Sequence, residues 1–132
     1  MDKNTLYFHT SNHVIEHRCD KTIKHSVSFG FLLSQACLQE LTTLSGRIEA
    51  MKTLFGLKYN IPVYINEHVL LFKVMDNNKQ YWINYYKVKR FKQCESKTVI
   101  LLENNETINV SKSLRAFQKL WKTLGLISEY RQ

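Results

Sequence analysis

The sequence predicts an α+β fold with N-terminal helical segments, a small, mainly antiparallel β-sheet of about five strands and a C-terminal amphipathic helix. Three observations support this prediction. Apolar residues recur at helical spacing over 28–57, short segments rich in branched and aromatic residues follow over 61–110, and a regular helical pattern closes the chain over 111–124. We expect a single domain over 1–132, because a chain of this length supports one hydrophobic core.

The N-terminal part divides into an arm and a helical segment. Residues 1–27 have a mixed pattern that predicts either a hairpin or an ordered arm. Apolar spacing predicts a first helix over 28–43, and Ser45-Gly46 is expected to separate it from a second helix over 47–57. Gly56 is the expected end of the second helix, because glycine adopts the left-handed conformation common at helix ends.

The β-block spans 61–110 and contains turn-forming Asn and Asp residues between its apolar segments. The predicted strands are 61–65, 69–74, 81–91, 98–102 and 107–110, and the third is expected to be interrupted near Asn84.

The closing helix is predicted to begin after Ser111 as its N-cap and to stop at Gly125. Its apolar residues fall on one face, and four cations fall on nearly the opposite face: Lys112, Arg115, Lys119 and Lys122. A cation in the first turn opposes the helix dipole, so a phosphate bound there would relieve the conflict at Lys112. This stripe is either a binding face or an ordinary solvated surface.

Positive charge is concentrated in the C-terminal half. The net charge is +8, of which residues 57–132 carry +7 and residues 1–56 carry +1. Within the basic half, residues 79–92 interleave aromatic rings with cations. This mixture suits nucleic acid, because cations displace counterions from phosphates and rings stack on bases. The alternative is a strand with its rings in the core, and Trp82 is expected there.

The sequence offers little for other chemistry. His9, His13, His17 and Cys19 have metal-ligand spacing only on a helix, whereas strand residues four apart are spread over about 13 Å. No phosphate-binding loop, dinucleotide turn or nucleophile elbow is present, and the carboxylates are scattered. We therefore predict no metal, no cofactor, no catalytic residue and no enzyme activity, with Cys37 as a core thiol.

Cysteine usage and hydropathy indicate the compartment. Cys19, Cys37 and Cys94 are an odd, unclustered set, which fits a reducing environment. No apolar run approaches the roughly 20 residues of a membrane span. We expect a cytoplasmic protein with no membrane partner.

Several short motifs, taken in order, resemble the ComK family of bacterial competence transcription factors. They are Cys37, Ser45-Gly46-Arg47, Lys52-Thr53, Ile61-Pro62, 69–72, Trp82-Ile83, 98–102, Asn105, Val110-Ser111 and Gln118. The β-block also resembles the LytTR class of DNA-binding domains. The resemblance implies a transcriptional activator that binds AT-rich promoter DNA, largely through the minor groove, as a homodimer or higher homo-oligomer. It also implies a possible regulatory adaptor protein.

Candidate DNA-binding residues follow from charge and chemistry. Arg47 and Arg90 are expected to enter a narrow, electronegative minor groove, and Asn84 to read adenine edges. The candidate phosphate contacts are Lys73, Lys79, Lys87, Lys89, Lys92, Lys112, Arg115, Lys119 and Lys122. Two alternatives stay open: a protein-interaction module or truncated relative that modulates a full-length regulator, and an RNA-binding module.

Overall fold

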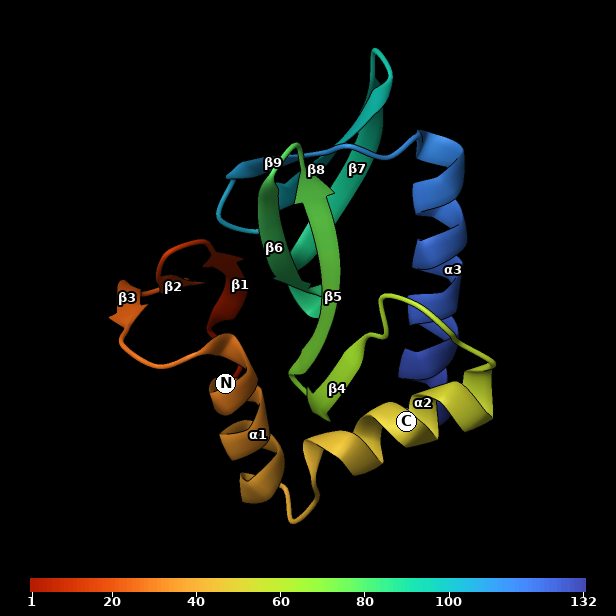
Figure 1. The fold of residues 1–132 in the computed structure, drawn as a ribbon. Helices are drawn as coiled ribbons and strands as arrows, with labels where there is room; N and C mark the ends of the chain where they lie inside the picture. Colours follow the sequence, from red (N-terminus) through yellow and green to blue (C-terminus); the bar gives the residue numbers. More distant parts are fainter.

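The computed structural model describes residues 1–132 and contains nine strands in two antiparallel sheets, together with three α-helices (Figure 1). The larger sheet has the order β3-β2-β1-β6-β5-β4 and the smaller one the order β7-β8-β9. The elements are β1 (Thr5–Thr10), β2 (Val14–Arg18), β3 (Thr22–His25), α1 (Phe29–Gln39), α2 (Leu44–Phe55), β4 (Val63–Asn66), β5 (Val69–Asp76), β6 (Lys79–Asn84), the 3₁₀-helix η1 (Tyr85–Lys87), β7 (Val88–Cys94), β8 (Lys97–Leu102), β9 (Thr107–Val110) and α3 (Leu114–Arg131). The α+β class is confirmed, with more strands than the sequence predicted.

The additional strands come mainly from the N-terminal arm. Strand β1 lies between β2 and β6, and Phe8 is paired with Trp82 across the β1–β6 ladder. Leu6, Tyr7 and Phe8 are all buried, so β1 is covered on both faces. A strand buried on both faces shows no alternation of apolar and polar residues, which explains why the arm looked poorly patterned.

The helices begin at side-chain caps. The Ser28 hydroxyl accepts a hydrogen bond from the Phe31 N–H, and the Thr43 hydroxyl accepts one from the Gly46 N–H at 3.0 Å. Gly46 therefore lies in the first turn of α2, and the expected break at Ser45-Gly46 was wrong. A Cβ at Gly46 would lie 2.9 Å from the capping oxygen, so the cap itself favours glycine. The predicted end at Gly56 is confirmed, with φ of 64°.

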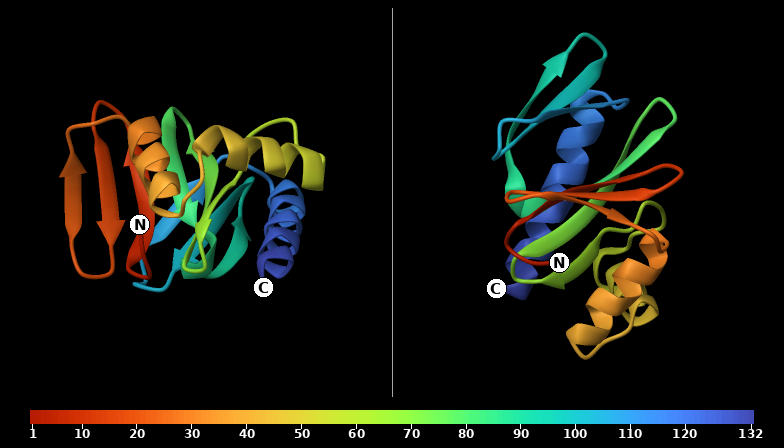
Figure 2. Two further views of the ribbon diagram at one scale, coloured as in Figure 1. Left: turned by 90° about the horizontal axis from the view of Figure 1, so that it is seen from below. Right: turned by 90° about the vertical axis from the view of Figure 1, so that its left-hand side faces the viewer.

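The larger sheet separates two hydrophobic cores (Figures 1 and 2). On one face, α1 packs through Leu33, Ala36 and Cys37, and Cys37 is fully buried as expected. On the other face, the smaller sheet and α3 pack through residues such as Ile100 and Phe117. None of the helices has the length and apolar content that a membrane span requires.

The predicted interruption near Asn84 is confirmed and is the crossover between the two sheets. Strand β6 ends at Asn84, η1 turns the chain, and β7 continues in the smaller sheet.

The closing helix differs from its prediction at both ends. Ser113 is the N-cap of α3, and its hydroxyl accepts from the Ala116 N–H. The Ser111 hydroxyl instead accepts from the Asn77 N–H at 3.0 Å, which ties the β5–β6 turn to the start of α3. The helix passes through Gly125 because Leu124, Ile127 and Ser128 are buried around it. Their burial outweighs the cost of about 1 kcal/mol for a helical glycine.

Candidate nucleic-acid interface

Strand β7 displays cations along the edge of the smaller sheet. It pairs only with β8, so its other edge has no partner strand. Lys89, Arg90 and Lys92 are exposed, whereas Phe91 turns toward the core. Charged side chains on an edge strand also discourage edge-to-edge aggregation, so exposure alone does not define a binding site.

On the outer face of the smaller sheet, two rows of side chains run across the three strands, and each row begins with a cation of β7. Lys92, Val99 and Asn109 are aligned across β7, β8 and β9, and so are Arg90, Leu101 and Thr107. Asn109 and Thr107 are exposed, while their neighbours Ile108 and Val110 are buried. The outer face therefore combines two cations with an amide and a hydroxyl that can form hydrogen bonds.

Helix α3 presents a second group of cations. Arg115, Lys119 and Lys122 are exposed and occupy positions i, i+4 and i+7, which share one face of a helix. The first turn contains no acidic residue and does contain Arg115. Because the helix begins at Leu114, Lys112 lies before the N-cap, and Arg115 is the residue that opposes the helix dipole.

The two groups belong to adjoining elements (Figure 1). The Phe91 ring of β7 lies 4.7 Å from Phe117 and 5.2 Å from Trp121, both of α3, measured between ring centroids. Trp121 in turn contacts Tyr85 of η1 at 4.5 Å. Burial raises the pKa of Tyr85, with contributions from Tyr86 and Glu129, so this phenol stays neutral. A rigid aromatic cluster therefore fixes β7 against α3.

Lys79 and Lys112 extend the charged region toward the start of α3. The Ser111 N–H donates to the Met75 carbonyl at 2.8 Å, and the hydroxyl of Thr98 donates to the Lys112 carbonyl at 2.9 Å. Lys79 follows the same β5–β6 turn and is exposed, and Lys112 is partly exposed.

These cations have no acidic partners. None of the ion pairs in the structure involves them, although the Lys89 ammonium donates to the Asn105 side-chain oxygen at 3.5 Å. We define the cationic surface as the eight residues Lys79, Lys89, Arg90, Lys92, Lys112, Arg115, Lys119 and Lys122. Unpaired cations on adjoining elements produce a positive potential that attracts a polyanion.

Asn84 does not belong to this surface. It is fully buried, and its side-chain amide donates to the Thr5 and His68 carbonyls at 2.9 Å. Its oxygen accepts from the Leu70 and Tyr86 N–H groups at 3.2 Å. The prediction that Asn84 reads adenine edges was wrong, because four internal hydrogen bonds occupy it at the crossover between the sheets.

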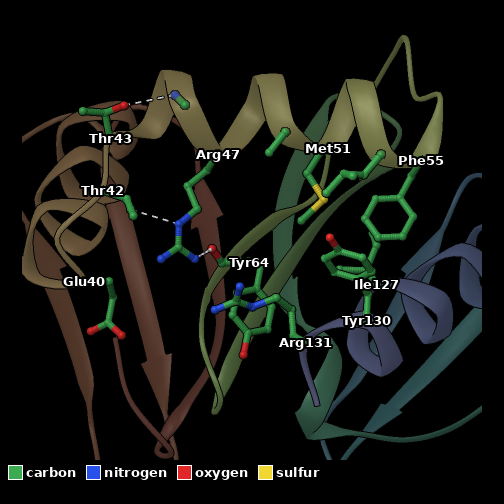
Figure 3. Close-up of a pocket in the computed structure, with 13 residues that line it drawn as sticks. Glu40, Thr42, Thr43, Arg47, Met51, Phe55, Tyr64, Ile127, Tyr130 and Arg131 are labelled. Carbon is green, nitrogen blue, oxygen red and sulfur yellow. Dashed lines mark hydrogen bonds between the residues drawn. The ribbon is translucent and has the colours of Figure 1, made fainter.

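Arg47 also has a structural position (Figure 3). Its guanidinium donates to the Thr42 hydroxyl at 2.9 Å and to the Tyr64 and Ile65 carbonyls of edge strand β4. It lines a cleft of about 620 Å³ formed by α2, β4 and the end of α3. These donors hold α2 against the sheet, so Arg47 is left out of the cationic surface, and its entry into a minor groove stays a prediction.

Two further lysines fall outside the cationic surface. Lys73 is paired with Trp82 on β5 and β6, on the sheet face that α1 covers. The Lys87 ammonium is paired with the Glu103 carboxylate at 3.5 Å, and its side chain is 18% exposed. We therefore leave both lysines out of the cationic surface, and their phosphate contacts stay predictions.

The rings of 79–92 mostly face inward. Tyr81, Tyr85, Tyr86 and Phe91 pack against the main core, while Trp82 packs on the α1 side, 5.2 Å from Phe29. Trp82 is therefore a core residue, as the sequence indicated. The rings stabilise the packing of the two sheets, and the cations face solvent.

The N-terminal histidines lie on strands and stack on tyrosines. His17 stacks on Tyr7 at 4.2 Å, and His9 on Tyr81 at 4.9 Å. Burial, together with a hydrogen bond to Glu106, raises the pKa of Tyr7, while burial lowers the pKa of His17. No three His, Cys, Asp or Glu side chains converge into a group with metal-binding geometry.

Sequence reasoning missed Thr107 and Asn109. Both alternate with buried Ile108 and Val110, and that alternation was the available signal for an exposed polar face on β9. What the sequence did not show is that this face continues across β8 to Arg90 and Lys92.

Comparison with known proteins gives one family. The family described as "ComK protein" matches the chain over residues 1–132. No curated protein and no solved structure shows a significant match. The chain therefore belongs to the ComK family, a family of DNA-binding transcription regulators of competence and not of enzymes.

Proposed function

We propose that this protein is a sequence-specific regulator that binds AT-rich promoter DNA through its cationic surface. The observation that carries the proposal is the set of eight cations on β7, on α3, at the start of β6 and just before the α3 N-cap, none of which has an acidic partner. Each Lys or Arg that neutralises a phosphate releases a condensed counterion, so such a surface favours duplex DNA.

Specificity requires groups that reach the base edges. Arg90 is the candidate for a narrow A-tract minor groove, where the negative potential is greatest. Asn109, two strands away on the same outer face, offers both a donor and an acceptor. The α3 cations then serve as phosphate contacts that fix orientation without reading sequence.

Duplex DNA fits this surface better than single-stranded RNA does. Proteins that bind single strands stack bases on exposed aromatic rings. Here the rings of 79–92 pack inward, and the outer face of the smaller sheet carries aliphatic and polar side chains instead. A protein-interaction module would not need eight unpaired cations on adjoining elements.

The proposal includes self-association and regulation in a bacterial cytoplasm. Two-fold promoter elements are commonly bound by symmetric dimers, so we expect a homodimer or higher homo-oligomer at the nucleoid. An adaptor protein that controls its activity is part of the same proposal.

A titration tests the proposal. Fluorescence anisotropy with an AT-rich duplex, a GC-rich duplex and single-stranded RNA, each at several salt concentrations, should give the tightest binding to the AT-rich duplex. Equal, weak binding to all three that disappears near physiological salt would refute it.

A further inference from the structure

Helix α1 has an unusual composition for a surface helix. The fourteen residues 26–39 contain no Lys, Arg, Asp or Glu, whereas the remainder of the chain contains all thirty. The outer side of a surface helix normally carries charges, and a helix that is apolar all round is normally buried.

The apolar residues of α1 lie on both of its sides. Leu33, Ala36 and Cys37 pack on the larger sheet. Phe31 and Leu38 are one heptad apart on the opposite side, where they are 51% and 54% exposed. Leu41, just beyond the helix, is 94% exposed. We call Phe31, Gln35 and Leu38 the uncharged face.

A groove adjoins this face. It lies between α1 and α2 and has a volume of about 420 Å³. Its six lining residues are all uncharged: Ser34, Leu38, Thr43, Leu44, Ser45 and Ile48. An exposed ring at Phe31 and a recess on the same surface are the two parts that an isologous contact needs, because each copy supplies both.

Charge is compatible with a second copy of this chain as the partner of this face. Two copies of a chain with net charge +8 repel each other wherever their cationic surfaces approach. The uncharged face lies on the α1 side of the larger sheet, and the smaller sheet and α3 lie on the other side. Contact through α1 therefore keeps the two cationic surfaces apart and leaves both accessible.

We propose that the uncharged face of α1, together with the α1–α2 groove, is the surface through which two copies of this protein form a symmetric dimer. The inference takes from the proposed function only the expectation of self-association. It adds the location of the contact and predicts that the dimer forms without DNA.

Sedimentation equilibrium of the full chain without DNA tests the inference. Gln35→Glu adds a charge at an exposed polar position and does not disturb the core, and Leu38→Glu replaces an exposed leucine. Leu54→Glu is the matched control, because Leu54 is a helical leucine of α2 with 52% exposure outside the groove. Circular dichroism confirms that each variant is folded.

The wild type should sediment at twice the monomer mass at tens of micromolar. Both Gln35→Glu and Leu38→Glu should raise the dimer dissociation constant at least about tenfold, and the control should change it less than about twofold. A wild type that stays monomeric, or a Gln35→Glu protein that dimerises normally, overturns the inference. Binding to AT-rich duplex is measured separately, so loss of the proposed DNA activity would leave this result standing.

Discussion

Neutralising two cations of α3 should weaken DNA binding in a calculable way. Arg115 and Lys119 are exposed, lie one turn apart and have no acidic partner. The change Arg115→Gln with Lys119→Gln removes both charges and keeps side chains with good helix propensity. Exposed substitutions of this kind change stability by about 0.5 kcal/mol or less, so the variant should fold normally.

The magnitude follows from counterion release. Each phosphate contact contributes about 0.9 to the slope of log K against log salt concentration. If both residues contact phosphates, the slope should become shallower by about 1.8, and affinity at 0.1 M salt should fall about 60-fold. Fluorescence anisotropy with an AT-rich duplex at several salt concentrations measures both quantities.

A matched control distinguishes a local contact from a general charge effect. Lys21→Gln with Lys24→Gln removes the same charge from exposed positions at β3, the far edge of the larger sheet. This control should change affinity by less than about threefold. If the α3 variant keeps the wild-type slope, or if the control loses as much affinity, α3 does not contact DNA.

Three further outcomes follow from the same structure. Arg90→Lys keeps the charge but loses the guanidinium, so the preference for AT-rich over GC-rich duplex should fall several-fold while affinity for the GC-rich duplex stays within about threefold. An unchanged ratio of the two affinities would exclude Arg90 from the groove. Asn84→Ala removes four buried hydrogen bonds and should lower the free energy of unfolding by about 3 kcal/mol in urea, and a loss below about 1 kcal/mol would contradict its structural role. The pKa of His17 is lowered in the folded protein, so the stabilising contribution of this residue is present above the ordinary His pKa of 6.5 and is lost as the pH falls below that value. Between about pH 7 and 5, the free energy of unfolding of His17→Gln should therefore fall less than that of wild type. Equal losses would argue against this effect.

The elements with regular patterns were predictable. The apolar and basic faces of α3 follow directly from residues three and four apart, and the predicted interruption near Asn84 marks a real change of direction. The precise start of α3 was ambiguous, because Ser111 and Ser113 are both good caps and only the bond from the Asn77 N–H to Ser111 distinguishes them.

The sequence could not identify which polar residues are internal. Asn84 and Arg47 are polar residues in a basic chain, yet both satisfy backbone groups of segments distant in sequence, such as Thr5 and Tyr64. Burial of this kind depends on how strands cross between sheets, which local patterns do not record. For the same reason, the sequence did not show that Asn109 and Lys92 are aligned across the smaller sheet.

Amide chemical shifts can show whether the cationic surface binds AT-rich duplex. Adding an AT-rich duplex to the isotopically labelled protein should shift the amides of 89–93, 107–109 and 112–122 and leave those of 21–25, at the far edge of the larger sheet, nearly unchanged. Shifts concentrated at 21–25, or absent from both β7 and α3, would contradict it.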